Sequence, residues 1–247
     1  CSSDLYRTIE DLNAIESCAR RSKRGAVVGG GLLGLEAAGA LKNLGIETHV
    51  IEFAPMLMAE QLDQMGGEQL RRKIESMGVR VHTSKNTLEI VQEGVEARKT
   101  MRFADGSELE VDFIVFSTGI RPRDKLATQC GLDVAPRGGI VINDSCQTSD
   151  PDIYAIGECA SWNNRVFGLV APGYKMAQVA VDHILGSENA FEGADLSAKL
   201  KLLGVDVGGI GDAHGRTPGA RSYVYLDESK EIYKRLIEIG RASCRER

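Results

Sequence analysis

Three glycines, Gly29, Gly31 and Gly34, form a Gly-x-Gly-x-x-Gly pattern between an apolar stretch, Ala26–Val28, and a run of small residues, Leu32–Leu44. At a strand-to-helix turn, this spacing is typical of loops that bind the pyrophosphate of a dinucleotide, although a glycine-rich turn that binds nothing is the alternative. The first glycine permits the tight turn, the second lets the backbone approach the phosphates, and the third lets the helix pack on the strand. The helix N-terminus adds free N–H groups and a partial positive charge. We expect the cofactor to contact Gly29, Gly30, Gly31, Leu32, Leu33 and Gly34.

An acidic residue, Glu52, follows the next apolar strand, predicted at Glu47–Ile51. A carboxylate roughly 20 residues after the glycine loop accepts hydrogen bonds from the adenine-ribose hydroxyls and repels a 2′-phosphate. No arginine follows in Phe53-Ala54-Pro55. The pattern therefore favours NADH over NADPH, and a solvated acid at a strand end is the alternative.

Two further positions could contact the same cofactor. Glu36 lies in the first turns of the glycine-loop helix, on the side expected to face the nicotinamide. An acid that complements a helix N-terminus explains Glu36 equally well. Thr118-Gly119 follows an apolar strand predicted at Phe113–Phe116, and it is either a cofactor contact or a turn.

The order of the elements around these residues predicts the fold class. Strands and helices alternate up to Gly119, which is typical of an α/β domain with a parallel sheet. The alternation of apolar residues changes between Thr87 and Val111, where Asp105-Gly106 predicts a hairpin turn in a small meander. The remaining predicted elements are helices at Tyr6–Arg20 and Glu60–Met77 and a strand at Val79–Thr83.

A second motif lies near the middle of the chain. Thr148 precedes an apolar strand predicted at Ile153–Ile156, which runs into Gly157-Glu158. This segment resembles the second FAD motif of the two-dinucleotide-fold flavoproteins, in which a threonine is followed by an apolar strand and Ala-x-Gly-Asp. The resemblance implies that Glu158 holds the flavin ribitol, with a longer side chain than the usual aspartate. Gly29–Glu36 and Thr118-Gly119 also match that family, where the glutamate equivalent to Glu36 faces the nicotinamide beside the flavin.

A helix predicted at Gly173–Leu185 follows Pro172, a residue that suits the first position of a helix. The resemblance implies that this N-terminus points at the flavin pyrimidine ring. Its partial positive charge would stabilise the anionic reduced flavin, so Pro172 and Gly173 join the expected cofactor contacts. An ordinary surface helix is the alternative.

Within this family, residues 6–237 are similar to the large subunits of bacterial NADH-dependent nitrite reductases. The resemblance implies hydride transfer from NADH to FAD, and then electron flow through an iron–sulfur cluster and sirohaem that reduces nitrite to ammonium, with a small subunit as a possible partner. The ligands of those two centres are expected outside this chain. The alternatives are a reductase of a separate ferredoxin- or rubredoxin-like carrier, or a module that only binds NAD. The similarity is strongest in Gly29–Met58, Phe116–Arg123, Ala155–Trp162 and Leu200–Val207.

The expected domain organisation is an NAD-binding domain, residues 25–119, inserted in an incomplete FAD-binding domain. A linker helix, residues 6–24, precedes it, and the C-terminal part of the FAD-binding domain occupies residues 120–187. Residues 188–237 are expected to start a C-terminal α+β domain, with strands at Leu200–Val207 and Ser222–Leu226. Residues 1–5 and 238–247 read as translated sequencing-adapter DNA, so we expect them to lie outside the fold.

The composition excludes several other classes. A net charge of −5 without a basic patch argues against nucleic acid as a partner. No apolar run reaches the ~18 residues of a membrane span, and no targeting segment is visible, so a cytoplasmic protein is expected. Cys18, Cys130, Cys146 and Cys159 lack metal-ligand spacing and are expected to be reduced structural thiols. The four scattered histidines are expected to be structural.

Overall fold

The computed structural model describes residues 4–5, 8–92, 94, 98–194, 197–202 and 205–240. The chain divides into two compact units. The first unit comprises the described residues of Cys1–Thr118 and Ala198–Arg247, and the second unit comprises those of Gly119–Ser197.

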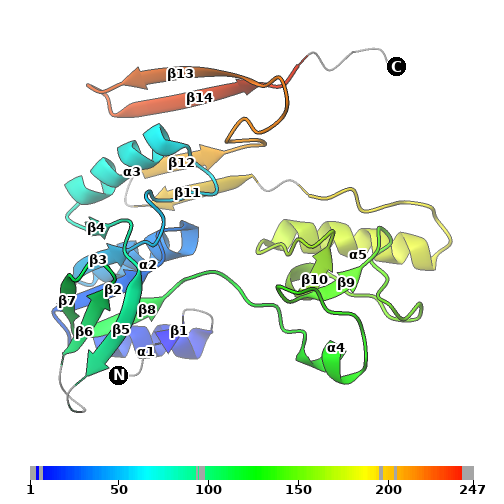
Figure 1. Ribbon diagram of the computed structural model, residues 1–247, viewed down its shortest axis with the longest axis horizontal. Coiled ribbons are helices and arrows are strands. Elements are labelled where there is room, and N and C mark those ends of the chain that lie inside the picture. Colours follow the sequence, from blue (N-terminus) through cyan, green and yellow to red (C-terminus); the bar gives the residue numbers. More distant parts are fainter. Residues whose placement is uncertain are drawn as a thin grey trace. The chain divides into compact units, whose positions relative to one another are not determined.

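The centre of the first unit is a five-stranded sheet in the order β1-β8-β2-β3-β4, in which all neighbouring strands are parallel (Figure 1). Val28 of β2 is in register with Ile51 of β3 and Phe116 of β8, so the carboxyl ends of these strands lie at one edge. This edge is where α/β sheets bind their ligands. The strands are β1 (Asp4–Leu5), β2 (Arg24–Val28), β3 (Glu47–Ile51), β4 (Arg80–His82) and β8 (Phe113–Phe116).

Two hydrophobic clusters support this sheet. Leu35 and Leu41 of α2 (Leu32–Asn43) are buried in a cluster that also holds Val27 and Val50. A second cluster joins Ile114 of the sheet to Met101 of an antiparallel three-stranded sheet. That sheet consists of β5 (Thr87–Gln92), β6 (Lys99–Phe103) and β7 (Glu108–Val111), and a turn at Gly106 (φ +80°) joins its last two strands, which confirms the predicted hairpin.

Side-chain caps determine where two helices begin. Helix α1 (Ile9–Ala19) starts after Thr8, whose hydroxyl accepts from the Asp11 N–H at 3.1 Å while Asp11 accepts from the Thr8 N–H at 2.7 Å. Helix α3 (Gln64–Ser76) begins later than the predicted Glu60, because Asp63 caps it by accepting from the Gly66 N–H at 3.0 Å. Tyr6, the predicted start of the first helix, lies outside the described residues.

The expectation that residues 1–5 and 238–247 lie outside the fold is wrong for part of each segment. Asp4 and Leu5 pair with Val115 and Phe116 along the free edge of β8, and Glu238 pairs with Arg221. The expected single strand at 200–207 is two antiparallel strands, β11 (Ala198–Leu202) and β12 (Val205–Gly209). Leu200 of β11 is fully buried in the same cluster as the apolar residues of α2. The apolar run at 200–207 therefore did not indicate that the chain reverses direction within it. Of the expected adapter residues, 1–3 and 241–247 lie outside the described residues.

A second hairpin, β13 (Arg221–Asp227) and β14 (Ile232–Glu238), also belongs to the first unit. It confirms the strand predicted at Ser222–Leu226, whereas β14 was not predicted. Asp63, the cap of α3, joins the two regions, because it accepts from the Tyr233 hydroxyl at 2.6 Å and pairs with Arg235 at 3.1 Å. Lys73 of α3 also pairs with Glu231.

The second unit has its own core, in which Met176 of its long helix packs with Phe167 and Phe191. The strand expected at Ile153–Ile156 is absent, since only Tyr154 forms an isolated bridge, to Gln147. The bonds from Thr148 N–H to Ile153 O and from Ala155 N–H to Cys146 O form this bridge. Its elements are α4 (Lys125–Gln129), β9 (Ile140–Ile142), the 3₁₀ helix η1 (Gly157–Cys159), β10 (Ala160–Trp162) and α5 (Val170–Ile184).

Candidate functional site

The glycine loop lies at the carboxyl end of β2, and backbone contacts dictate two of its three glycines. Gly29 has φ +116°, and a Cβ added there would lie 2.1 Å from the Ser117 carbonyl oxygen. A Cβ added at Gly34 would lie 1.9 Å from the Gly29 carbonyl oxygen. Neither overlap can be relieved without moving main chain. The backbone of Ser117, a residue that the sequence did not single out, therefore leaves no room for a side chain at Gly29.

Gly31 differs from both of these glycines. It is the N-cap residue of α2, its backbone is extended, and a Cβ added there would meet no atom within 4 Å. No side chain caps this helix end and its first turn holds no acidic residue, so the N–H groups that begin α2 remain available to an anion. Leu32 and Leu33 supply the first of these groups, and Leu33 is exposed.

Gly30 is held from both sides by residues outside the loop. Its N–H donates to Glu52 Oε2 at 2.5 Å, and its carbonyl accepts from the Met58 N–H at 3.0 Å. The other oxygen of Glu52 accepts from the Ala54 N–H at 2.7 Å. A Cβ at Gly30 would approach Leu57 Cδ2 to 2.6 Å. The half-buried carboxylate of Glu52 therefore lies beside the phosphate-binding turn, with both its oxygens oriented by backbone donors.

The other predicted residues of the first unit are more open. Glu36 is exposed on α2, between the buried Leu35 and Ala37. Thr118 is exposed at the end of the first unit, and Gly119 begins the second unit with φ +100° and open space around an added Cβ. The positive φ at Gly119 explains the glycine by itself. The backbone of Thr118 adjoins the glycine loop, because its nitrogen would lie 3.5 Å from a Cβ added at Gly29.

In the second unit, a turn brings Gly157 against the long helix. Gly157 has φ +76°, its N–H donates to Met176 Sδ at 3.3 Å, and a Cβ at Gly173 would lie 3.2 Å from the Gly157 Cα. Glu158 follows in η1 with an exposed side chain. The loop at Gly157 therefore lies next to the first turn of α5, and the neighbouring Glu158 side chain faces solvent.

The helix start predicted at Pro172 is wrong. Helix α5 begins at Val170 after the N-cap Leu169, so Pro172 and Gly173 lie inside its first turn. A proline is tolerated there because the first four N–H groups of a helix have no intrahelical partner. Proline spacing alone could not distinguish these positions.

A histidine pair joins β3 and β4, so these two histidines are not scattered as the sequence suggested. His49 Nδ1 and His82 Nε2 are 3.0 Å apart, and the two rings stack with centroids 5.2 Å apart. His49 is 2% exposed. Burial, and then the neighbouring His82, lower the pKa of His49 to about 4. Both imidazoles of the pair are therefore neutral near pH 7, since burial also lowers the pKa of His82.

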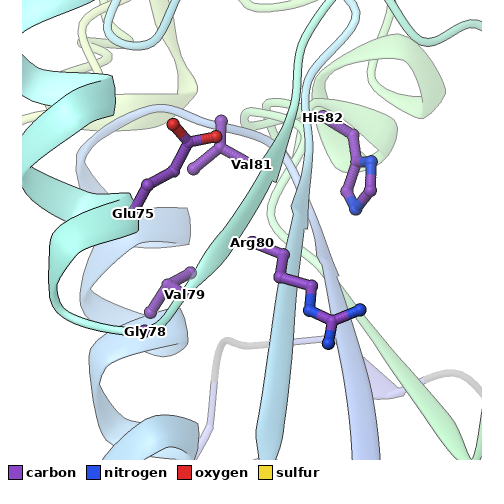
Figure 2. Close-up of a pocket in the computed structure, with 6 residues that line it drawn as sticks. All are labelled: Glu75, Gly78, Val79, Arg80, Val81 and His82. Atoms are coloured by element: carbon purple, nitrogen blue, oxygen red, sulfur yellow. The ribbon is translucent and has the colours of Figure 1, made fainter.

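A charged cluster surrounds this pair. Glu47 contacts His49 at 3.5 Å, Arg24 at 3.3 Å and Arg80 at 3.1 Å. Burial alone would raise the pKa of Glu47, but the two arginines outweigh it and lower the pKa. Figure 2 shows a surface depression along β4, with Arg80 and His82 on one side of the strand and Val81 on the other. None of the predicted site residues lines this depression.

Other features bear on metal and membrane partners. Within the described ranges, no three His, Cys, Asp or Glu side chains gather closely enough to hold a metal ion. Cys130, Cys146 and Cys159 are free, but Cys18 is disulfide-bonded, which corrects the expected reduced thiol at that position. Among the helices formed by described residues, none has the length and apolar character needed to cross a bilayer.

Comparison with known proteins matches residues 2–183 to the family of pyridine nucleotide-disulphide oxidoreductases. The chain is 56% identical over 233 residues to the nitrite reductase [NAD(P)H] large subunit of Klebsiella oxytoca, which covers 94% of this chain and 24% of that protein. It is 40% identical over 236 residues to a nitrite reductase [NAD(P)H] of Bacillus subtilis (strain 168), covering 95% of this chain and 29% of that protein. The chain therefore spans between about a quarter and a third of these relatives.

The fold resembles that of a solved NAD-dependent persulfide reductase from A. fulgidus. The TM-score is 0.78 with 26% sequence identity, and the match covers 90% of this chain and 42% of that one.

Proposed function

The chain belongs to the pyridine nucleotide-disulphide oxidoreductase family, and from this we propose that it is the NADH-binding, electron-input portion of a nitrite reductase large subunit. The observation that carries the proposal is the glycine loop. Gly29 and Gly34 shape it against fixed main chain, and Gly31 leaves open space at an uncapped helix N-terminus. A pyrophosphate placed there would meet N–H groups and the positive end of α2 rather than a side chain.

Glu52 supports NADH as the dinucleotide. Its carboxylate is fixed beside the loop by the N–H groups of Gly30 and Ala54, and each oxygen retains a free lone pair for a ribose hydroxyl. A 2′-phosphate at the same place would bring negative charge against a partly buried carboxylate. Glu36, exposed on the same helix, would lie on the nicotinamide side of the site.

The second unit would supply part of an FAD site. Gly157 leaves open space beside its turn, Glu158 offers an exposed carboxylate for the ribitol hydroxyls, and Gly173 lies at the N-terminal end of α5. Thr118 and Gly119 would also contact cofactor. FAD, when bound, accepts a hydride from NADH and passes the electrons on singly. Residues 25–119 would thus act as the NAD-binding domain and residues 120–187 as part of the FAD-binding domain, with residues 188–237 starting a further domain.

The chain carries a single Gly-x-Gly-x-x-Gly, and its residues bind NADH in this proposal. A second dinucleotide loop for FAD would come from a part of the protein that this sequence does not include. We therefore expect the chain by itself to bind NADH but to retain no stoichiometric FAD. A yellow purified chain, with a flavin absorption spectrum at one FAD per chain, would contradict this division of the site.

The activity of the whole protein is part of the same proposal. Electrons would pass from FAD through an iron–sulfur cluster to sirohaem, both held outside this chain, and would reduce nitrite to ammonium in the cytoplasm, with a small subunit as a partner. The identity to two nitrite reductases supports this acceptor over a ferredoxin- or rubredoxin-like carrier.

The test is nitrite-dependent oxidation of NADH by the whole protein that contains this chain, compared with its reduction of a rubredoxin or a ferredoxin. Ammonium formed at one per three NADH oxidised is expected. NADH oxidation that responds to the carrier protein but not to nitrite would overturn the proposed acceptor and leave the NADH site standing.

A further inference from the structure

Phe53 is exposed where a phenylalanine is normally buried. The other phenylalanines are buried or half-buried in the two units, whereas the Phe53 side chain is 73% exposed. An exposed ring forgoes the roughly 1.5–3 kcal/mol that burial of such a side chain contributes to folding. The packing of this chain therefore does not explain the residue.

The backbone on both sides of Phe53 is fixed. The Glu52 carbonyl accepts from the Lys85 N–H at 2.9 Å, and the Ala54 carbonyl accepts from the Ser84 N–H at 2.9 Å. The Ala54 N–H in turn donates to the Glu52 carboxylate at 2.7 Å. The turn that carries Phe53 is thus held to the strand end next to β4, and its ring projects from a rigid support.

The nearby cation is already engaged. Lys85 Nζ donates to Asp105 at 2.5 Å and to Ser107 at 2.7 Å, and it lies 5.2 Å from the centre of the Phe103 ring. It is therefore not free to cover Phe53. The exposed ring of Phe53 belongs to the residue directly after Glu52, whose carboxylate is proposed to hold the adenine ribose.

We propose that Phe53 is the platform on which the adenine ring of NADH stacks, an inference that rests on the proposed NADH site. If Glu52 holds the ribose, the attached adenine lies close to the turn that contains Glu52, and Phe53 is the next residue of that turn. The exposed aromatic ring of Phe53 can stack on the π-face that every purine offers. Phe53 contacts the face of the adenine and forms no hydrogen bond with its edge. This stacking contributes to the affinity for the adenosine half of NADH and to its orientation.

The test is calorimetric titration of the chain with ADP-ribose, which carries the adenine and pyrophosphate but no nicotinamide. Loss of a stacked base costs about 5- to 150-fold in affinity, so Phe53→Ala is expected to weaken binding within that range. Phe53→Tyr keeps the ring and should stay within about threefold of the wild type. Phe53→Leu keeps apolar area without a π-face and should fall between the two. Tyr174→Ala, which removes an equally exposed ring from the second unit, is the matched control and should change nothing.

A second variant gives a signal that general loss of structure would not produce. Phe53→Trp places an indole at the turn, and ADP-ribose should quench its fluorescence while ribose 5-phosphate should not. Wild-type affinity in Phe53→Ala, or an indole that ADP-ribose leaves unquenched, would overturn the inference. If the wild-type chain binds no ADP-ribose at all, the proposed NADH site fails and the inference fails with it.

Discussion

The two units treat their glycine turns differently. In the first unit the loop is complete, because main chain at Ser117 and Gly29 excludes side chains at two positions and an uncapped helix follows the third. In the second unit, the turn at Gly157 contacts helix α5, a Cβ added at Gly157 would meet no atom within 4 Å, and the acidic residue beside it faces solvent. Helix α5 of that unit also exposes Val170, Tyr174, Ile184 and Leu185.

This difference shows how each site is encoded. A dinucleotide site formed by one contiguous strand–turn–helix carries all its steric requirements in the segment itself, so it can be recognised and can form locally. A flavin site assembled from distant parts of a chain shows only partial geometry in any one part. Binding of NADH in the first unit is therefore expected to be independent of the second unit.

The largest effect is expected from Gly31→Val. An added Cβ meets nothing in the protein, so the variant should fold with a free energy of unfolding close to that of the wild type. Its side chain would occupy the space proposed for the pyrophosphate, and NADH affinity should fall by at least about 100-fold. Gly34→Val is the matched control, because its Cβ would meet the Gly29 carbonyl oxygen at 1.9 Å and should cost stability as well as binding. Equal loss of stability in both variants would make Gly31 a structural glycine.

Glu52→Ala should narrow the preference for NADH over NADPH by about 1–3 kcal/mol, the range for one hydrogen bond to a charged group. The Gly30 N–H loses its acceptor in this variant, so absolute affinity for NADH should fall too. Both dinucleotides would be titrated into each protein. Glu52→Gln keeps an acceptor for Gly30 without the charge, and it should separate the two effects. An unchanged NADH to NADPH ratio would remove Glu52 from nucleotide choice.

Acid should weaken the first unit through His49. The pKa of His49 is about 4 in the folded protein, below its ordinary value of 6.5, because burial disfavours the charged ring. Above pH 6.5 the proton is absent from both states and costs nothing. As the pH falls from 6.5 towards 4, the unfolded state binds the proton first, so stability decreases, by about 2 kcal/mol between pH 7.5 and 5.

Urea unfolding at these two pH values measures that loss, and hydrogen exchange assigns it to a unit. His49→Gln should reduce the dependence on pH even if it lowers stability at pH 7.5, and His82, whose pKa burial also lowers, should leave a smaller slope. A slope that stays at the wild-type value in His49→Gln would show that other groups dominate.

The smallest effect is expected from Glu36→Gln. The side chain is exposed on α2, and it is proposed to lie at the nicotinamide end of the site. NADH affinity of the chain should change by less than about 0.5 kcal/mol, the usual range for a surface substitution. In the whole protein the same change should slow flavin reduction by NADH without raising the NADH concentration needed for half-maximal rate. A large loss of NADH binding in the chain would show that Glu36 acts on binding instead.

The sequence predicted the fold best where one local pattern was sufficient. Short apolar runs placed β2, β3 and β8 within a few residues. The pattern failed where tertiary contacts decide. Met58, which holds the Gly30 carbonyl, and the His49–His82 pair are distant in sequence from their partners, and no spacing signalled them. The apolar pattern at 200–207 is compatible with one strand or with a hairpin. In the structure it is a hairpin, and Leu200 of its first strand packs in the cluster that contains α2.

The central claim, that the first unit holds the NADH site, is tested most directly by hydrogen exchange of the chain with and without saturating NADH. Slower exchange is expected at the backbone amides of residues 30–36 and 52–58, where the glycine loop, the start of α2 and the Glu52 turn would meet the cofactor. Exchange in residues 120–194 should not change. Unchanged exchange at residues 30–36, or protection confined to the second unit, would contradict the assignment of the NADH site.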